Sequence, residues 1–265
     1  GALIDRVVQP FGIREFRFDP EQGFYLNGEH IGRLNGVAMH QDFAGKGYAV
    51  SEADVEASLA LIMEIGANAV RLGHYPFSRY TLERVSELGL VAWAERPSGV
   101  RTTVDTCEAI DIPEASVANV RQQLVEMIRQ QYNHAAIAVW SIGNETSFGQ
   151  VGCDEPYDNV TPVLRSLNEL AKSEDPTRPT VYSEFPHPVN RSGPYATEGI
   201  TDLFATNRYF LWYHEPIDDF SPLLDGLHAL AAGQPLAVSE YGAGSSVEHQ
   251  TDNPVGGVGR THTPE

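Results

Sequence analysis

The chain has 265 residues, 42% of them hydrophobic and 20% charged, which is the composition of a globular domain with a sizeable core. Its formal net charge of −18 disfavours binding to nucleic acid or to an anionic membrane, because both would repel it. No apolar run approaches the roughly 20 residues of a membrane span, and the two cysteines, Cys107 and Cys153, show no metal-ligand spacing. An uncharged small-molecule substrate such as a sugar is compatible with this charge.

Residues 1–30 are predicted to form a short β-rich lead-in. Apolar runs at residues 7–8, 13–18 and 24–26 indicate strands, and the dipeptide Asn27-Gly28 is a strong hairpin-turn signal. We therefore expect a hairpin ahead of the main domain.

The main domain, residues 31–265, alternates short apolar strands with amphipathic helices. Strands are predicted at residues 34–39, 69–72, 91–94, 136–142, 180–183, 203–206 and 236–239. Helix starts are indicated by Ser51, Ser78, about Ser116, Thr161-Pro162 and Ser221-Pro222. Strands that are buried on both faces and alternate with helices indicate a parallel sheet, and seven of them favour an α/β fold of the TIM (β/α)8-barrel type.

The barrel is expected to be incomplete at its C-terminal end. Only 25 residues follow Glu240, and they are rich in Gly and Pro and contain no eighth strand. An open barrel leaves unpaired edges on its first and seventh strands. We therefore expect association through this seam, or dependence on flanking domains, and weak activity of the isolated piece.

Polar and aromatic side chains recur where the predicted strands end. In a barrel enzyme the active groups lie at these carboxyl ends. The candidates, in chain order, are His40 and Asp42, His74, Glu95, Asn144 and Glu145, Asn207, Tyr209 and Trp212, and Glu240. Trp93 and Trp140 lie inside strand runs and are expected in the core.

Two of these candidates, Glu145 and Glu240, directly end the fourth and seventh apolar runs, "AIAVWSIGNE" and "PLAVSE". These strands face each other across a barrel. Retaining glycoside hydrolysis needs such a pair of carboxyls, about 5–5.5 Å apart, one as nucleophile and one as acid and then base. The pair therefore predicts a glycosidase site.

Six segments resemble motifs of glycoside hydrolase family 2, in family order. They are "GVAMHQDFAGKG" at 36–47, "NAVRLGHYP" at 68–76, "VAWAERP" at 91–97, "WSIGNETS" around Glu145, "NRYFLWY" at 207–213 and "SEYGAG" around Glu240. The resemblance implies the TIM-barrel domain of a β-glycosidase, with Glu145 as acid/base and Glu240 as nucleophile.

The resemblance also implies roles for the other candidates. Asn144 would bond the sugar 2-hydroxyl, Tyr209 would donate to Glu240, and Trp212 would form part of the pocket wall. The remaining candidates, His40, Asp42, His74, Asn207 and Glu95, would line the sugar site. For His40 a structural bond to the backbone is an equally good interpretation, and Glu95 would raise the pKa of the acid through like charge.

No metal or other cofactor is expected. In lactose-cleaving members of the family, a glutamate at the Glu95 position and a histidine two residues later help to hold magnesium. This sequence has Pro97 instead of the histidine, and its nine histidines show no ligand spacing.

A β-D-galactoside is the expected substrate, because the residues after Glu240 resemble those of bacterial β-galactosidases. β-Glucuronidase and β-mannosidase are the alternatives within the family, and an inactive carbohydrate-binding barrel is the alternative outside catalysis. The family implies flanking β-sandwich domains, a possible homo-oligomer, and a soluble location in the bacterial cytoplasm or periplasm.

Overall fold

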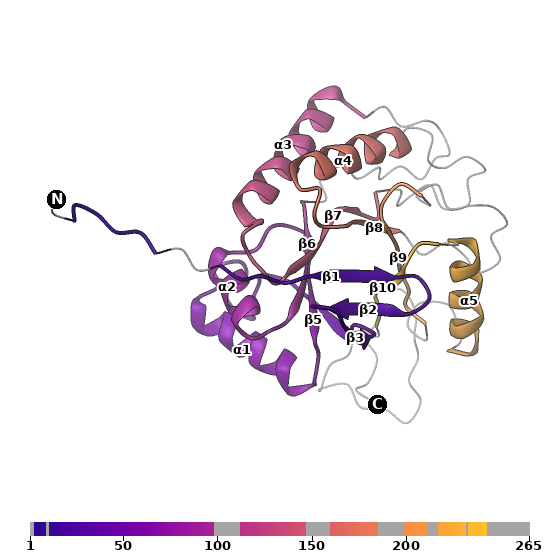
Figure 1. Cartoon of the computed structure of the whole chain (residues 1–265), viewed down its shortest axis with the longest axis horizontal. Coiled ribbons are helices and arrows are strands. Elements are labelled where there is room, and N and C mark those ends of the chain that lie inside the picture. The colour runs from indigo at the N-terminus through magenta and orange to yellow at the C-terminus, as the bar shows by residue number, and fades with distance from the viewer. Residues whose placement is uncertain are drawn as a thin grey trace.

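A computed structural model describes residues 3–8, 11–97, 112–146, 160–184, 199–210, 217–231 and 233–242. Within these residues seven parallel strands form a nearly closed barrel in the order β10-β9-β8-β7-β6-β5-β4 (Figure 1). The strands are β4 (Gly36–Met39), β5 (Ala69–Leu72), β6 (Val91–Glu95), β7 (Ile137–Asn144), β8 (Thr180–Glu184), β9 (Leu203–Asn207) and β10 (Leu236–Glu240). Each of the seven predicted barrel strands is present, which confirms the predicted TIM-barrel fold.

Helices on the outside of the barrel connect these strands. They are α1 (Glu52–Glu64), α2 (Arg79–Glu87), α3 (Glu114–Gln131), α4 (Val160–Glu174) and α5 (Phe220–Leu230), the last preceded by a short 3₁₀ turn, η1 (Ile217–Asp219). The helices α4 and α5 begin slightly earlier than predicted, so that Pro162 and Pro222 lie in their first turns. A first-turn proline is tolerated there, because the N–H that it lacks would have no partner within the helix.

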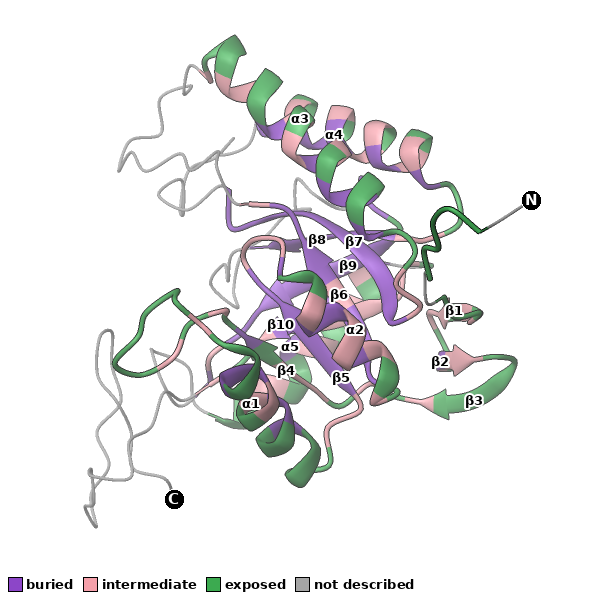
Figure 2. Cartoon of the chain, turned by 90° about the vertical axis from the view of Figure 1, so that its left-hand side faces the viewer, coloured by how far each residue is buried: buried purple, intermediate pink, exposed green. Residues whose placement is uncertain are grey.

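The barrel interior and the inner helix faces make up the core. Every residue of β5, β7, β8 and β9 is buried, as is usual for a parallel sheet covered by helices (Figure 2). Leu59 of α1, Leu124 of α3 and Leu164 of α4 point into this core and are almost fully buried. Trp140 of β7 is fully buried, as predicted, and its Nε1 donates to Asp175 at 2.9 Å.

A small antiparallel sheet lies against the barrel at the ends where its strands begin. It contains β1 (Phe16–Asp19), β2 (Gly23–Leu26) and β3 (Glu29–Gly32). Phe16, Phe18 and Phe24 pack with residues that start the barrel strands, among them Ala69 and Leu203. These aromatic side chains fill the end of the barrel opposite the carboxyl ends of the strands.

The turn between β2 and β3 has the predicted chemistry, whereas the predicted strand upstream of β1 is absent. Asn27 and Gly28 both have positive φ, +52° and +80°, as a two-residue hairpin turn requires. Residues 3–8 form no strand, and their apolar side chains are exposed on a segment that extends away from the barrel (Figure 1). No other described strand lies beside this segment to pair with it.

The seam between β4 and β10 is bridged by side chains instead of by a hydrogen-bonded ladder. Tyr241 donates its hydroxyl to the carbonyl oxygen of Gly36 at 2.9 Å, and Arg71 of β5 reaches the carbonyl oxygen of Ser239 at 3.3 Å. Residues 243–265, where an eighth strand was not expected, lie outside the described residues. Among the helices that the structure describes, none is both long and apolar enough to span a membrane.

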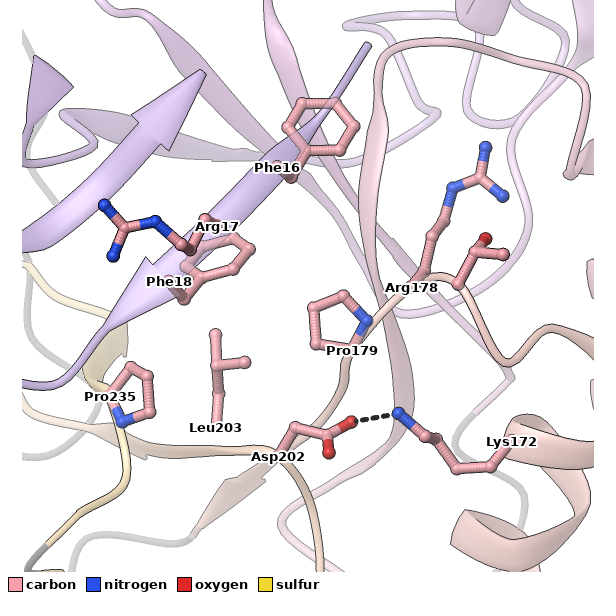
Figure 3. A pocket seen from close by; sticks show the side chains of 10 residues that line it. Phe16, Arg17, Phe18, Lys172, Arg178, Pro179, Asp202, Leu203 and Pro235 are labelled. Carbon is pink, nitrogen blue, oxygen red and sulfur yellow. Dashed lines mark hydrogen bonds and ion pairs between the residues drawn. The ribbon is translucent and has the colours of Figure 1, made fainter. Parts of the chain in front are cut away.

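A pocket of about 310 Å³ lies between β1 and the starting ends of β8, β9 and β10 (Figure 3). Its three cationic side chains are paired: Arg17 with Asp19 at 2.8 Å, Lys172 with Asp202 at 2.9 Å, and Arg178 with Asp175 at 2.6 Å. It therefore offers no uncompensated charge to a ligand, and it is at the opposite end of the barrel from the predicted glutamates.

Candidate active site

The carboxyl ends of the barrel strands bring the predicted glutamates into one polar network. Glu240 is the last residue of β10, and Glu145 directly follows β7. A register shift between Ser141 and Asn144 interrupts the ladder of β7 with β8, and Glu145 has a positive φ of +45°. That conformation is unfavourable for a residue with a side chain, and it is held by the hydrogen bond from the Glu145 N–H to the carbonyl oxygen of Ser183 at 2.9 Å.

Glu240 accepts hydrogen bonds from two strong donors. Arg71 Nη1 donates to its Oε1 at 2.5 Å, and the Tyr209 hydroxyl donates to its Oε2. His74 Nε2 lies 3.6 Å from Oε1. The two donors therefore orient both oxygens of this carboxylate.

Glu145 meets a neutral donor instead. Asn207 Nδ2 donates to Glu145 Oε1 at 2.6 Å and to Asn144 Oδ1 at 3.1 Å. Glu145 and Asn144 are both largely buried, with 8% and 7% of their surface exposed. Asn144, Asn207 and Arg71 therefore link the two glutamates in one network.

Arg71 connects this network and was not selected by the sequence analysis. Its Nη2 donates to Glu95 Oε2 and to Asn144 Oδ1, each at 2.8 Å. Burial alone would lower the pKa of Arg71, but the charges of Glu95 and Glu240 outweigh burial and raise it, so the guanidinium stays charged. The signal was present in the sequence, because Arg71 is the one charged residue in the four-residue buried strand β5.

Glu95 lies beneath the site and has no exposed surface. Its carboxylate accepts from Arg71, from His74 Nδ1 at 2.7 Å and from Ser141 Oγ at 2.8 Å. Burial raises its pKa, but the charge of Arg71 and the bond from His74 outweigh burial and hold the pKa at about 2. Glu95, which was expected to line the sugar site, thus supports Arg71 and His74.

The residues around Glu95 do not fit a magnesium site. Both of its carboxylate oxygens are occupied by protein donors, and Pro97 offers no side-chain ligand. No group of three or more His, Cys, Asp or Glu side chains suited to a metal ion occurs among the described residues.

Two further candidates, His40 and Asp42, lie in the exposed segment after β4. Nδ1 of His40 is 2.8 Å from the carbonyl oxygen of Gly73, which can only accept, so this nitrogen carries the proton. The bond to the backbone that was one of the two interpretations of His40 is therefore present. The His40 ring also lies 5.5 Å from the His74 ring, measured between centroids. Trp212, Cys107 and Cys153 lie outside the described residues.

Asn207, which was expected to line the sugar site, contacts three polar residues of this network. It ends β9 and has no exposed surface, and its side chain contacts Asn144, Glu145 and Ser239. Ser239, which the sequence analysis did not select, donates its hydroxyl to Asn207 Oδ1 at 2.6 Å. Nothing in the sequence pattern separates this serine from an ordinary strand residue.

Comparison with known proteins identifies the family. The model of the glycosyl hydrolases family 2 TIM barrel domain matches residues 20–254. The chain belongs to glycosyl hydrolase family 2. The match covers all seven barrel strands and both glutamates. The six motifs noted in the sequence therefore all lie within the part of this family 2 barrel that matches the family model.

Individual relatives in family 2 carry two kinds of name. A β-glucuronidase from Bacteroides fragilis is 39% identical over 256 residues, which is 96% of this chain and 34% of that protein. A β-galactosidase from Thermoanaerobacterium thermosulfurigenes is 34% identical over 180 residues, 66% of this chain and 22% of that protein.

A solved structure gives the same picture of the barrel. Bacteroides uniformis β-glucuronidase 2, covalently bound to cyclophellitol-6-carboxylate aziridine, superposes with a TM-score of 0.79 at 31% identity. The superposition covers 93% of this chain and 29% of that one. The family 2 barrel described here thus spans about a third of the length of the relatives that it matches.

Proposed function

We propose that this chain is the catalytic barrel of a retaining β-glycosidase in which Glu240 is the nucleophile and Glu145 the acid/base. The observation that carries the proposal is the pair of strand-end carboxyls in one hydrogen-bonded network. Arg71 and Tyr209 donate to Glu240, and the amide of Asn207 donates to Glu145. A carboxylate held at both oxygens is oriented for attack, and the second carboxyl is suited to exchange a proton.

In the first half of the reaction a Glu240 oxygen bonds to the anomeric carbon while the bond from that carbon to the aglycone oxygen breaks. Glu145 gives its proton to the departing oxygen, so the aglycone leaves as a neutral alcohol. Arg71 stays hydrogen-bonded to the reacting carboxylate and orients it. The product of this half-reaction is a covalent glycosyl-enzyme and an ionised Glu145.

In the second half Glu145 takes a proton from water, and the oxygen of that water bonds to the anomeric carbon. The ester bond to Glu240 breaks, which releases the sugar with its original β configuration and restores both carboxyls. Asn144, whose Oδ1 is held by Arg71, keeps its amide N–H groups for the sugar 2-hydroxyl. Tyr209 contacts Glu240 Oε2, and His74 lies near Glu240 Oε1.

We further propose that the sugar is a β-D-glucuronide. Two facts support this above the galactoside that the sequence alone suggested. The relative with 39% identity over 96% of the chain is named a β-glucuronidase. The Bacteroides uniformis relative is covalently bound to a cyclophellitol aziridine that carries a carboxylate. β-Galactoside hydrolysis is the second candidate, supported by the β-galactosidase that is 34% identical over 66% of the chain.

Azide rescue tests the two catalytic roles in the full natural protein to which these residues belong. Glu240→Ala should lower kcat on the order of 10³-fold or more, and azide should restore turnover of a dinitrophenyl β-glycoside with an α-glycosyl azide as product. Glu145→Ala should instead yield a β-glycosyl azide from the same substrate. If the stereochemistry of the two azide products is exchanged, the assigned roles are reversed.

Paired substrates and a probe test the choice of sugar. The 4-nitrophenyl β-glucuronide should have a kcat/KM at least about 100-fold above that of the matching galactoside. The reason is that a galactoside lacks the carboxylate and leaves the polar groups that would bind it without a partner. Cyclophellitol-6-carboxylate aziridine should label Glu240, as seen by peptide mass spectrometry, and Glu240→Gln should not be labelled. A higher kcat/KM for the galactoside would replace the glucuronide with the second candidate.

A further inference from the structure

Four residues from four strands form a closed hydrogen-bonded ring next to the two glutamates. Arg71 of β5 donates through Nη2 to Asn144 Oδ1 of β7 at 2.8 Å, and Asn207 Nδ2 of β9 donates to the same oxygen at 3.1 Å. Ser239 Oγ of β10 donates to Asn207 Oδ1 at 2.6 Å, and Arg71 Nη1 closes the ring on the Ser239 carbonyl oxygen at 3.3 Å. All four residues are buried, with at most 8% of their surface exposed.

The ring leaves one orientation for each amide. Arg71 has only donors, so the Asn144 atom that it meets must be the amide oxygen. The Asn207 atom that faces this oxygen must then be Nδ2, and the other Asn207 atom must be Oδ1. That buried oxygen needs a donor, and the hydroxyl of Ser239 supplies it.

The fixed orientation of Asn207 determines what Glu145 meets. Asn207 Nδ2 donates to Glu145 Oε1 at 2.6 Å and so holds this side of the carboxyl group in place. We propose that Ser239, acting through Asn207, is a positioning residue that holds the acid/base Glu145 in the orientation that proton donation needs. This inference rests on the acid/base role proposed for Glu145.

Removal of the Ser239 hydroxyl weakens the hold on this amide. Asn207 Oδ1 would lose its donor in a fully buried position. Rotation of the amide cannot relieve this loss, because it would turn Oδ1 toward Asn144 Oδ1, which Arg71 fixes as an oxygen. The Asn207 side chain is then expected to shift toward another donor, which displaces its contact with Glu145. Proton donation should weaken while attack by Glu240 stays possible.

Substrates with different leaving groups distinguish this role from general damage to the site. A dinitrophenyl aglycone departs without protonation, whereas a phenyl aglycone needs the acid. In the full natural protein, Ser239→Ala should lower kcat/KM for the phenyl glycoside about 10–100-fold and for the dinitrophenyl glycoside less than about 3-fold. Ser239→Thr, which keeps the hydroxyl, should restore the phenyl substrate.

Ser183→Ala is the matched control. Ser183 lies on β8, which is separated from β10 by β9, and it is fully buried. Its hydroxyl has no hydrogen-bond partner among the described residues, and the substitution keeps the backbone carbonyl that accepts from the Glu145 N–H. Loss of this hydroxyl should leave the dependence on the leaving group as in the unmodified protein. If Ser239→Ala does not fold, Ser239→Cys keeps a weak donor of similar size and should show the same selective loss to a smaller extent.

The outcomes separate this inference from the proposed function. If Ser239→Ala lowers kcat/KM equally for all aglycones, or not at all, the positioning role is overturned while the glycosidase assignment stands. If Ser183→Ala reproduces the selective loss, the ring is not its cause, and the role is likewise overturned. If the unmodified protein cleaves no glycoside or still cleaves after Glu240→Gln, the proposed function itself fails, and this inference fails with it.

Discussion

The pair of Arg71 and Glu95 places two buried charges next to the candidate nucleophile. Such a pair is costly to desolvate, and it is stable here because every oxygen of Glu95 accepts from a protein donor. Removing one partner leaves the other charge buried without compensation. The same contacts that orient the site therefore also tie its integrity to the ionisation of Glu95.

Glu95→Gln should lower the free energy of unfolding at pH 7 by about 3–5 kcal/mol, as for other broken buried pairs. The pKa of Glu95 is depressed to about 2, so its contribution is present above its ordinary pKa and is lost as the pH falls toward 2. The difference between wild type and variant should therefore shrink below about pH 4.5. Urea unfolding between pH 7 and pH 3, with exposed Glu64→Gln as control, measures this. A difference that stays constant with pH contradicts it.

Activity should survive exhaustive chelation, because Glu95 is engaged by protein donors and Pro97 supplies no ligand. The measurement is kcat/KM in the presence of excess EDTA, before and after dialysis against metal-free buffer. A large loss that magnesium reverses would mean that a divalent ion contributes after all.

At the scale of the elements, the start of α1 also orders the loop that carries His40 and Asp42. Ser51 and Asp54 form a reciprocal capping box, and Lys46 from this loop bonds both oxygens of Asp54 at 2.8 Å. The helix cap and the loop therefore share one carboxylate.

Ser51→Ala should lower the free energy of unfolding by about 1 kcal/mol, because the N-terminal N–H groups of α1 lose their acceptor. Ser58→Ala in the same helix is the control, since Ser58 bonds only its own helix backbone in the described structure and alanine favours the helix. Thermal unfolding of both variants gives the comparison. An equal loss of unfolding free energy in both variants would show that the Ser51 cap does not stabilise the helix specifically.

Strand and helix positions followed from the sequence more closely than their ends did. β7 reaches Asn144, two residues beyond the predicted end, because the strand continues past a register shift up to the candidate acid/base residue Glu145. Residues 7–8 have the alternation of a strand, but an extended segment becomes a strand only beside a partner, and the described residues supply none.

At the scale of the whole molecule, the seam between β4 and β10 is the part of the barrel where opening is easiest. β4 and β10 are the two ends of the described sheet and are joined by side-chain bonds, including that of Tyr241. Edge strands that lack a ladder open more easily than paired ones. The chain covers about a third of the length of its relatives, so those proteins contain further residues that could support the seam.

The isolated 265-residue chain should therefore be less active than the full natural protein, by at least about 10-fold in kcat, because a 1 Å displacement of catalytic groups costs on the order of 100-fold. Parallel assays with a dinitrophenyl glycoside, combined with light scattering to detect association, test this. Equal kcat values in a monomeric isolated chain would contradict it.

The sequence by itself determined the barrel, the two glutamates and the family motifs, because hydrophobic periodicity and strand-end residues are local properties of the chain. The glycosidase motifs at Glu145 and Glu240 needed no contact information. Only the tertiary structure decided that Glu95 and Asn207 lie beneath the site and that Arg71 and Ser239 complete its network. The physical reason is that burial and hydrogen bonding depend on which strands become neighbours across the barrel, and residues as far apart as 71 and 239 meet only when it closes.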